Sequence, residues 1–170
     1  MNFEQLSTRD EALLLTFARR LRRFADARQE QSLLRGKNLG LLCDLGDSEP
    51  ASRFRRAATD LGARVALIHP DLSPASSDVD IAETGRMLGR LYDGIECLGI
   101  DASVVKRLGA AAKVPVYDGI SAGDHPTAKL AARLGAEDVV EQCHRFVIQA
   151  VLLSTLDGLT DVGHESESRP

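Results

Sequence analysis

The chain has 170 residues, of which 44% are hydrophobic and 27% are charged, a composition typical of one soluble globular domain with its own core. Its 21 basic and 25 acidic residues give a net charge of −4, which excludes a broad positive field and argues against nucleic acid as the main partner. The cysteines, Cys43, Cys97 and Cys143, lie far apart in apolar surroundings without a CxxC pair, so we predict reduced core thiols and no metal site.

Targeting and membrane signals are not found in the sequence. The first residues, MNFEQLSTRDEALLL, include acids and have neither the basic start nor the small-residue cleavage site of a signal peptide. The longest apolar run, 146–156, is interrupted by Gln149 and is too short to span a bilayer. The sequence therefore predicts a cytoplasmic protein without a membrane partner, and we expect no cofactor.

The first predicted helix covers residues 7–26. Thr8 and Glu11 have the three-residue spacing of a capping box. Arginines between positions 19 and 23 fill one face, which is more typical of a solvated helix face than of a ligand site. The apolar residues of the other face recur at helical spacing and are Leu13, Leu14, Phe17, Leu21 and Phe24.

Short apolar strands and helices alternate through the middle of the chain. The predicted strands are 38–44, 64–70, 95–100 and 114–119, and the predicted helices run through 54–61, 78–92, 102–112 and 125–134. This alternation indicates βαβ units with right-handed crossovers. The predicted fold is a three-layer α/β sandwich, with a parallel sheet of about four strands flanked by helices. Ligands of such sheets bind beyond the carboxyl ends of the strands, at the turns 44–50, 69–77, 100–102 and 118–126.

The last predicted helix, 137–157, is apolar around much of its circumference and must be buried on more than one side. We expect it to pack back on the sheet domain, so that residues 1–158 form a single domain. Residues 159–170 are small, polar and charged, and are predicted to be a disordered tail.

Two separated segments carry recognisable motifs. One contains Gly89-Arg90-Leu91-Tyr92-Asp93-Gly94, and the other contains His125-Pro126-Thr127-Ala128. Upstream, GKNLGLL and FRRAATDLGARV follow in the same order as in the family described next. The set closely resembles the carbamoyl-phosphate-binding domain of aspartate and ornithine carbamoyltransferases, nearest the ornithine enzymes, whose blocks are Gly-Arg-Met-Tyr-Asp-Gly and His-Pro-Thr-Gln.

The resemblance also covers the end of the chain. Residues 144–158 look like the family's terminal helix, which returns to the first domain after a second, amino-acid-binding domain. Few residues separate Gly135 from this helix. The resemblance therefore implies a chain whose second domain has been deleted and whose first domain is resealed by its own last helix.

The turn after the first strand is acidic where the family grips phosphate with a Ser-Thr-Arg-Thr-Arg segment. The resemblance places 47–51, Asp-Ser-Glu-Pro-Ala, at those five positions. Losing two charge-assisted contacts of roughly 1.5 to 3 kcal/mol each lowers affinity by about two to four powers of ten. Asp47 or Ser48 is expected to cap the next helix, and a cation or amine site formed by Asp44, Asp47 and Glu49 is the alternative.

Other positions of the family's site are partly kept. By resemblance, Arg90 matches an arginine that contacts the phosphate, and His125 matches the histidine that polarises the carbamoyl carbonyl. Ala128 replaces the glutamine that would hold the carbamoyl amide, and His144 replaces an arginine of the terminal helix. The ligand-binding candidates are Asp47, Ser48, Glu49, Arg90, His125, Thr127 and His144.

Structural interpretations of the two kept residues remain open. Arg90 is also placed to form an ion pair with Asp93, and His125 to begin a helix capped by Asp124. Together, Arg90 and His125 support the hypothesis of a vestigial anion pocket.

The leading hypothesis for function is a truncated, degenerate carbamoyltransferase-like protein that is non-catalytic and binds a ligand or a protein. Carbamoyl transfer needs an amine held in line with the carbonyl carbon in a closed cleft, which the family's second domain provides. The alternative is a residual carbamoyltransferase, or another carbamoyl phosphate-dependent enzyme, that works with a partner chain. Two weaker alternatives are a hydrolase built from Ser121, His125 and Asp118, and a signalling receiver that is phosphorylated on Asp44.

The resemblance further implies self-association, because the family's carbamoyl-phosphate domains meet in a trimer. A loop after the second strand completes the shared site in the family, and the corresponding segment 69–80 is short and lacks a basic residue other than His69. We expect a homo-oligomer, with a trimer favoured, and a protein partner on the surface that the missing domain would expose.

Overall fold

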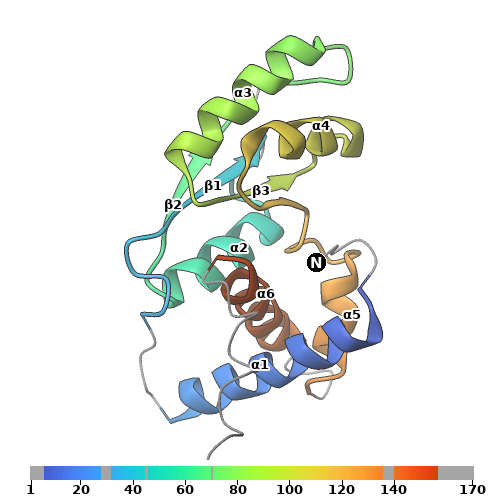
Figure 1. Cartoon of the computed structure of the whole chain (residues 1–170). Coiled ribbons are helices and arrows are strands. Elements are labelled where there is room, and N and C mark those ends of the chain that lie inside the picture. Colours follow the sequence, from blue (N-terminus) through green and yellow to red (C-terminus); the bar gives the residue numbers. More distant parts are fainter. Residues whose placement is uncertain (1–5, 28–31, 45, 70, 136–139, 157–170) are drawn as a thin grey trace, which may run out of the picture.

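The computed structural model describes residues 6–27, 32–44, 46–69, 71–135 and 140–156 (Figure 1). Its helices are α1 (Thr8–Asp26), α2 (Glu49–Asp60), α3 (Asp78–Leu91), α4 (Ala102–Ala112), α5 (Pro126–Ala132) and α6 (Val140–Leu156). Its strands are β1 (Asn38–Cys43), β2 (Arg64–Ile68), β3 (Gly94–Leu98) and β4 (Val116–Asp118). The predicted tail at 159–170 and the predicted helix start at 137–139 lie outside the described residues.

The described strands form one parallel sheet in the order β2-β1-β3-β4. Leu41 of β1 lies opposite Leu67 of β2 on one side and Glu96 of β3 on the other. The chain therefore leaves β1 toward one edge of the sheet and later returns past it toward the other edge. This reversal places a topological switch point between β1 and β3, where ligands of open α/β sheets bind. The predicted parallel α/β fold is confirmed.

Helices cover both faces of the sheet. Figure 1 shows α3 and α4 above the sheet and α2 and α6 below it, with α1 packed on the far side of α6. This arrangement follows from right-handed crossovers on a sheet whose order reverses at β1. Successive residues of β1 alternate between the two cores, since Leu39, Leu41 and Cys43 join the larger core and Leu42 joins the smaller one under α3 and α4.

Helix α6 lies in the larger core and contacts α1, α2 and α5. From Cys143 to Ser154 every residue except Arg145 is buried, which explains the apolar circumference seen in the sequence. The packing of the last helix against the domain is therefore as predicted. None of the helices in the described part of the chain is long and apolar enough to cross a membrane.

Helices α3 and α4 approach one another closely at two glycines. A Cβ added at Gly89 would overlap the carbonyl oxygen of Ala112, and one at Gly85 would lie 2.8 Å from the carbonyl oxygen of Leu108. Any side chain at these positions would push the helices apart. The glycine that opens the Gly89-Arg90 block thus has a structural role in helix packing.

Two predicted helix caps are wrong by one residue. Ser7 rather than Thr8 caps α1 and forms the capping box with Asp10. His125 rather than Asp124 caps α5, because its own Nδ1 accepts from the backbone N–H of Thr127 at 3.2 Å. The predicted cap of α2 is confirmed for Ser48, whose Oγ accepts from the backbone N–H of Ala51.

Candidate functional site

The candidate site lies beyond the carboxyl ends of β1, β3 and β4, at the switch point of the sheet. Ser48 begins α2 after β1, and the turn after β4 leads to His125 at the start of α5. The first residues of α6 approach the same region, since Glu141 contacts α2. Three separated segments therefore supply polar side chains to one place.

Arg53 of α2 is the central cation of this region, and only 8% of it is exposed. Its Nε and Nη2 donate to the two carboxylate oxygens of Glu141 at 2.7 and 2.8 Å, which makes a bidentate pair. Nη2 also donates to Glu49 Oε1 at 2.7 Å, and Nη1 donates to the carbonyl oxygen of Ser121. These hydrogen bonds hold the pKa of the Glu141 carboxyl below its ordinary value.

Glu96 points from β3 into the same region and is fully buried. Its carboxyl oxygens accept from the Ser121 Oγ at 2.8 Å, the Ser121 N–H at 3.1 Å and the Ile120 N–H at 3.3 Å. Burial raises the pKa of Glu96 to about 8, although the hydrogen bonds from Ser121 oppose this shift. At neutral pH, Glu96 is therefore mostly a neutral acid that fixes the turn after β4.

Thr127 and His144 join this turn to α6. The Thr127 Oγ1 donates to the carbonyl oxygen of Ile120 at 2.6 Å. The same carbonyl lies 3.2 Å from His144 Nε2, which must carry a proton to donate there. Burial, followed by the nearby Arg53 charge, lowers the pKa of His144 to about 4. His144 is therefore neutral near pH 7 and supplies no positive charge to the site.

His125 is oriented by its role as a helix cap. Its Nδ1 lies 2.9 Å from the Thr127 Oγ1 and accepts from the Thr127 N–H at 3.2 Å, and this cap assigns the ring proton of the neutral imidazole to Nε2. This tautomer leaves Nε2 as the hydrogen-bond donor of the ring. Three of the ligand-binding candidates, His125, Thr127 and His144, thus lie in contact with one another.

One carboxylate of the acidic turn 44–49 is paired with an arginine of the same chain. Glu49 pairs with Arg53, one helical turn further along α2, whereas Asp44 and Asp47 are exposed. Among the described residues no group of three or more His, Cys, Asp or Glu side chains is arranged to hold a metal ion. The alternative of a cation site therefore receives no support from this part of the chain.

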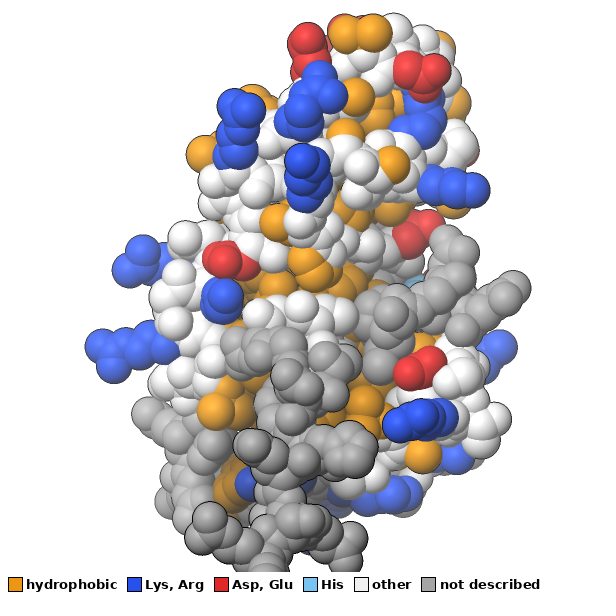
Figure 2. All heavy atoms as spheres, viewed as in Figure 1, with side chains coloured by type: hydrophobic (Ala, Val, Ile, Leu, Met, Phe, Trp, Pro, Cys, Tyr) orange, Lys and Arg blue, Asp and Glu red, His pale blue; other side chains and the backbone are white. Residues whose placement is uncertain are grey.

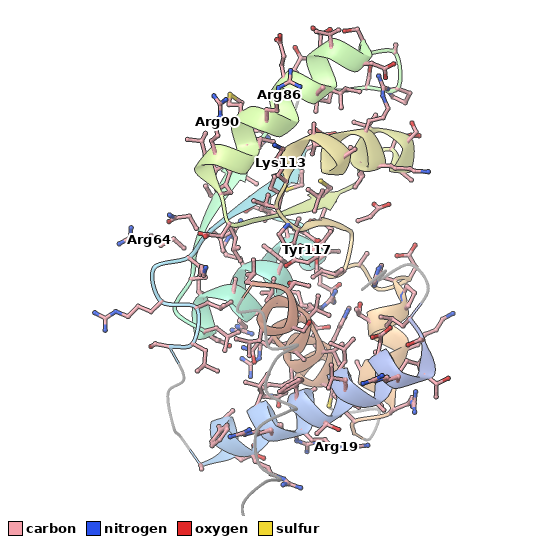
Figure 3. The ribbon with its side chains drawn as sticks, viewed as in Figure 1. Arg19, Arg64, Arg86, Arg90, Lys113 and Tyr117 are labelled. Carbon is pink, nitrogen blue, oxygen red and sulfur yellow. The ribbon has the colours of Figure 1, made fainter. Side chains whose placement is uncertain are left out.

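Arg90 lies elsewhere in the molecule. Figure 3 shows it on α3 beside Arg86, on the opposite side of the sheet from α2 and α6, so it does not meet His125. It lines a shallow hollow with Glu83, Arg86 and neighbouring apolar residues of α3. The suggested ion pair with Asp93 is not formed either, because Asp93 accepts from the Asn38 N–H and pairs with Lys37.

The two weaker hypotheses from the sequence, a hydrolase triad and phosphorylation of Asp44, both concern this region. Ser121 is fully buried and its Oγ donates to Glu96, so it is neither exposed nor directed at His125. The hydrolase triad of Ser121, His125 and Asp118 is therefore not assembled. Asp44, the residue proposed for phosphorylation, is exposed directly after β1.

A hollow of about 360 Å³ opens beside Arg53. Its lining is highly charged, with Glu49 and Arg56 contributed by α2 and Glu141 and Arg145 by α6. Because the carboxylates already occupy Arg53, the hollow offers mixed charges rather than a positive cradle for an anion.

Sequence reasoning missed Arg53 and Glu96 as members of the site, and it considered Ser121 only for a hydrolase triad. Glu96 carried a readable signal, because a charged residue within the apolar segment IECLGI must be buried with partners. The spacing of Glu49 and Arg53 also predicts their pair on one helix face. The second partner of Arg53, Glu141, is 88 residues away in sequence and could not be predicted.

The fold is that of a doubly wound α/β domain, with polar groups at the switch point of its sheet. Comparison of the sequence with family models gives the particular family. The model for the aspartate/ornithine carbamoyltransferase, carbamoyl-P binding domain, matches residues 1–134. The chain belongs to this family.

The similar proteins of known name are members of the same family. An ornithine carbamoyltransferase of Actinobacillus pleuropneumoniae is 35% identical over 156 residues, which cover 92% of this chain and 46% of the relative. One from Haemophilus influenzae is 37% identical over 137 residues, or 81% of this chain and 40% of the relative. The chain thus spans less than half the length of these relatives.

Solved structures show the same architecture. The ornithine carbamoyltransferase from Pyrococcus furiosus superposes with a TM-score of 0.66 at 23% identity, over 78% of this chain and 42% of that one. An aspartate transcarbamoylase from Trypanosoma cruzi, solved in complex with N-(phosphonacetyl)-L-aspartic acid, gives a TM-score of 0.62 at 25% identity, with the same shares. The predicted family and fold are confirmed.

Proposed function

We propose that this protein is a non-catalytic member of the family, a pseudoenzyme that acts by binding a ligand or a protein. The observation that carries the proposal is the bidentate pairing of Arg53 with Glu141, supplemented by Glu49. Arg53 is the buried guanidinium next to the positions that match the family's phosphate-gripping segment. Its Nε and Nη2 donate to carboxylates of the same chain, which take the position that an anion would need.

Competition explains why this pairing opposes anion binding. A carboxylate tethered on the same chain competes at an effective concentration on the order of millimolar or higher, so a free phosphate must displace it. The displaced Glu49 and Glu141 would then face the phosphate as like charges. Exposed Asp44 and Asp47 add negative charge at the same turn. Each of these effects lowers the affinity for carbamoyl phosphate.

Calorimetry with carbamoyl phosphate and an assay for citrulline and carbamoyl-aspartate test the proposal. We expect neither binding heat nor product from the wild-type protein with ornithine or aspartate. The double variant Glu49→Gln, Glu141→Gln should gain weak binding of inorganic phosphate, because it frees Arg53. Glu83→Gln, which changes an exposed carboxylate of α3, is the matched control and should gain none. Tight binding and product formation by the wild type would refute the proposal.

His125 favours a second candidate, a residual carbamoyl phosphate-dependent enzyme that works with a partner chain. Its Nε2 proton is suited to polarise a carbonyl group, the role that the resemblance implies. Product formation that is lost in His125→Ala but kept in His69→Ala, a change at an exposed histidine, would support this candidate. Equal activity of the two variants would exclude it.

We further propose that residues 1–158 act as one cytoplasmic domain that forms a homo-oligomer, with a trimer expected. Val79, Met87 and Leu91 on the outer face of α3 are each more than half exposed, which is unusual for large apolar side chains. Figure 2 shows apolar and basic side chains together on this part of the surface. Light scattering coupled to gel filtration tests the assembly, and a monomer at all concentrations would favour a different protein partner.

A further inference from the structure

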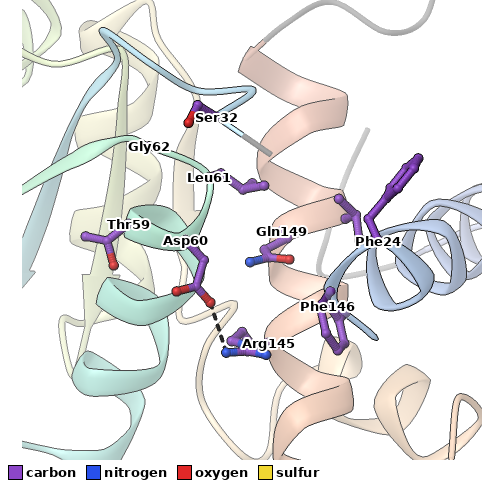
Figure 4. Close-up of a pocket in the computed structure, with 11 residues that line it drawn as sticks. Phe24, Ser32, Thr59, Asp60, Leu61, Gly62, Arg145, Phe146 and Gln149 are labelled. Atoms are coloured by element: carbon purple, nitrogen blue, oxygen red, sulfur yellow. Dashed lines mark ion pairs between the residues drawn. The ribbon is translucent and has the colours of Figure 1, made fainter. Parts of the chain in front are cut away.

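A second pocket, of about 460 Å³, lies between α1, α2 and α6, away from the site at the strand ends (Figure 4). This volume falls in the range of ordinary small-molecule sites. The pocket is lined by parts of the chain that are far apart in sequence, because α1, the end of α2 and the middle of α6 converge there. Neither the resemblance nor the switch-point site accounts for it.

One wall of the pocket is polar and incompletely paired. Arg145 pairs with Asp60 through Nη1 at 2.9 Å, but its Nε–H has no hydrogen-bond partner among the described residues. Gln149 is only 3% exposed, and its Nε2 donates to the carbonyl oxygen of Ala57 at 3.2 Å. No described residue donates to the Gln149 Oε1. Of these polar atoms, only the Arg145 Nε is both buried from solvent and unpaired, at a cost of about 1 to 3 kcal/mol.

The other wall of the pocket is apolar. It is formed by Leu21 and Phe24 of α1, by Leu61 just after α2, and by Phe146 of α6. The Arg145 guanidinium lies 5.0 Å from the centre of the Phe146 ring, a cation–π distance that holds the cation beside the apolar surface. A ligand of this pocket must therefore combine polar and apolar parts.

The two charges of the polar wall select the polar part of the ligand. A plain carboxylate would bind Arg145 but face the negative Asp60, and a plain amine would bind Asp60 but face the positive Arg145. A zwitterion satisfies both, with its carboxylate on the Arg145 guanidinium and its ammonium group on Asp60. We propose that the pocket between α1, α2 and α6 binds an α-amino acid with an apolar side chain, which packs on Phe24 and Phe146.

This inference deepens the proposed function, because it names a ligand class for a protein that acts by binding. It rests on that proposal only for its biological meaning, since the pocket shares Arg145 with the hollow beside Arg53 but is otherwise lined by different residues. Carbamoyl phosphate binding and product formation decide the proposed function, whereas amino-acid binding decides the inference. The failure of one is therefore distinguishable from the failure of the other.

The experiment measures the thermal midpoint of the full chain against ligand concentration, since specific binding raises it progressively. We expect L-phenylalanine and L-leucine to raise it, and L-aspartate to have no effect. The analogues 3-phenylpropanoate and 2-phenylethylamine each lack one charge and should bind at least about tenfold more weakly than L-phenylalanine. This ligand series needs no variant and remains decisive if a substitution prevents folding.

Variants then locate the binding. Arg145→Met and Asp60→Asn should each weaken L-phenylalanine binding at least about tenfold. The matched control is Arg56→Met, which removes an exposed arginine of α2 that does not line this pocket, and it should bind like the wild type. The inference is overturned if neither L-phenylalanine nor L-leucine shifts the thermal midpoint at about 10 mM. It is equally overturned if an analogue binds as well as L-phenylalanine, or if Arg145→Met retains full binding.

Discussion

Two polar regions of this domain are both built on α2 and α6, but they differ in how completely their side chains are paired. At the switch point, every nitrogen of Arg53 donates to a partner within the chain, and Glu96 receives three hydrogen bonds. In the pocket between α1, α2 and α6, Arg145 retains an unpaired Nε–H. The first region therefore stabilises the fold, whereas the second has hydrogen-bonding capacity left for a ligand.

The difference shows that the position of the family's site and the availability of unpaired polar groups do not coincide in this chain. The switch point is where the family and the fold both predict ligand binding, yet this chain fills it with Glu49 and Glu141. A buried polar network of this kind rigidifies its surroundings when all members are paired. Binding chemistry is then more readily found where polar groups are incompletely paired, as at Arg145.

The largest expected effect comes from Glu96→Ala at the switch point. The change leaves the N–H groups of Ile120 and Ser121 without acceptors inside the protein and also opens a cavity. We expect the free energy of unfolding to fall by about 3 kcal/mol or more. Urea denaturation measures it, with Glu83→Ala on the exposed face of α3 as the control. A loss below about 1 kcal/mol would mean that the network is not a stabilising unit.

Arg53→Met should have a smaller effect than Glu96→Ala. The freed Glu49 and Glu141 are mostly exposed and can be hydrated, so the main loss is the donor to the buried Ser121 carbonyl and the link between α2 and α6. We expect unfolding free energy to fall by about 2 kcal/mol. The control Arg56→Met, at an exposed position of α2, should change it by less than about 0.5 kcal/mol. Equal losses in both variants would contradict the pairing.

Most of the fold could be predicted from the sequence because its signals are local. Short apolar segments such as NLGLLC, separated by amphipathic helices, are enough to predict a parallel sheet, and all the predicted strands and helices were found. The caps of α1 were ambiguous because Ser7 and Thr8 each have an acid three residues later. Local sequence cannot decide between such overlapping motifs, since the choice depends on where the chain enters the helix.

Less of the site could be predicted because its contacts are long-range. His125, Thr127 and His144 were found through a resemblance, and they do meet in the structure. Arg90 fulfils the motif in sequence but lies across the sheet, so a matching residue type alone did not place it in the site. Arg53 was missed because its main partner is Glu141. The two residues meet only through the packing of α6 against α2, which the sequence does not reveal.

The pH dependence of stability separates Glu96 from the rest of the network. Burial raises its pKa from 4.5 to about 8, so the folded protein holds a proton there that the unfolded chain releases, and stability falls as pH rises through this range. His144, with its pKa lowered to about 4, acts oppositely and loses stability as pH falls from about 6.5 to 4.

Between about pH 6.5 and 8, the pH dependence of the unfolding free energy therefore comes from Glu96 and not from His144. We expect the unfolding free energy of the wild type to fall by about 1 to 2 kcal/mol over this window, and Glu96→Gln to remove most of the fall. Urea titrations at closely spaced pH values measure both. An identical pH profile in the variant would show that Glu96 is not the titrating group.

The smallest effect on stability is expected for Arg145→Met in the second region. The substitution removes a partly exposed ion pair with Asp60, which contributes little, and it also removes an unpaired buried donor, which is unfavourable in the wild type. The two changes nearly cancel, so unfolding free energy should change by less than about 0.5 kcal/mol. Urea denaturation of Arg145→Met and Arg53→Met under the same conditions compares the two regions directly. If Arg145→Met costs as much as Arg53→Met, Arg145 is part of the structural framework, and the contrast between a paired network and an incompletely paired pocket does not hold.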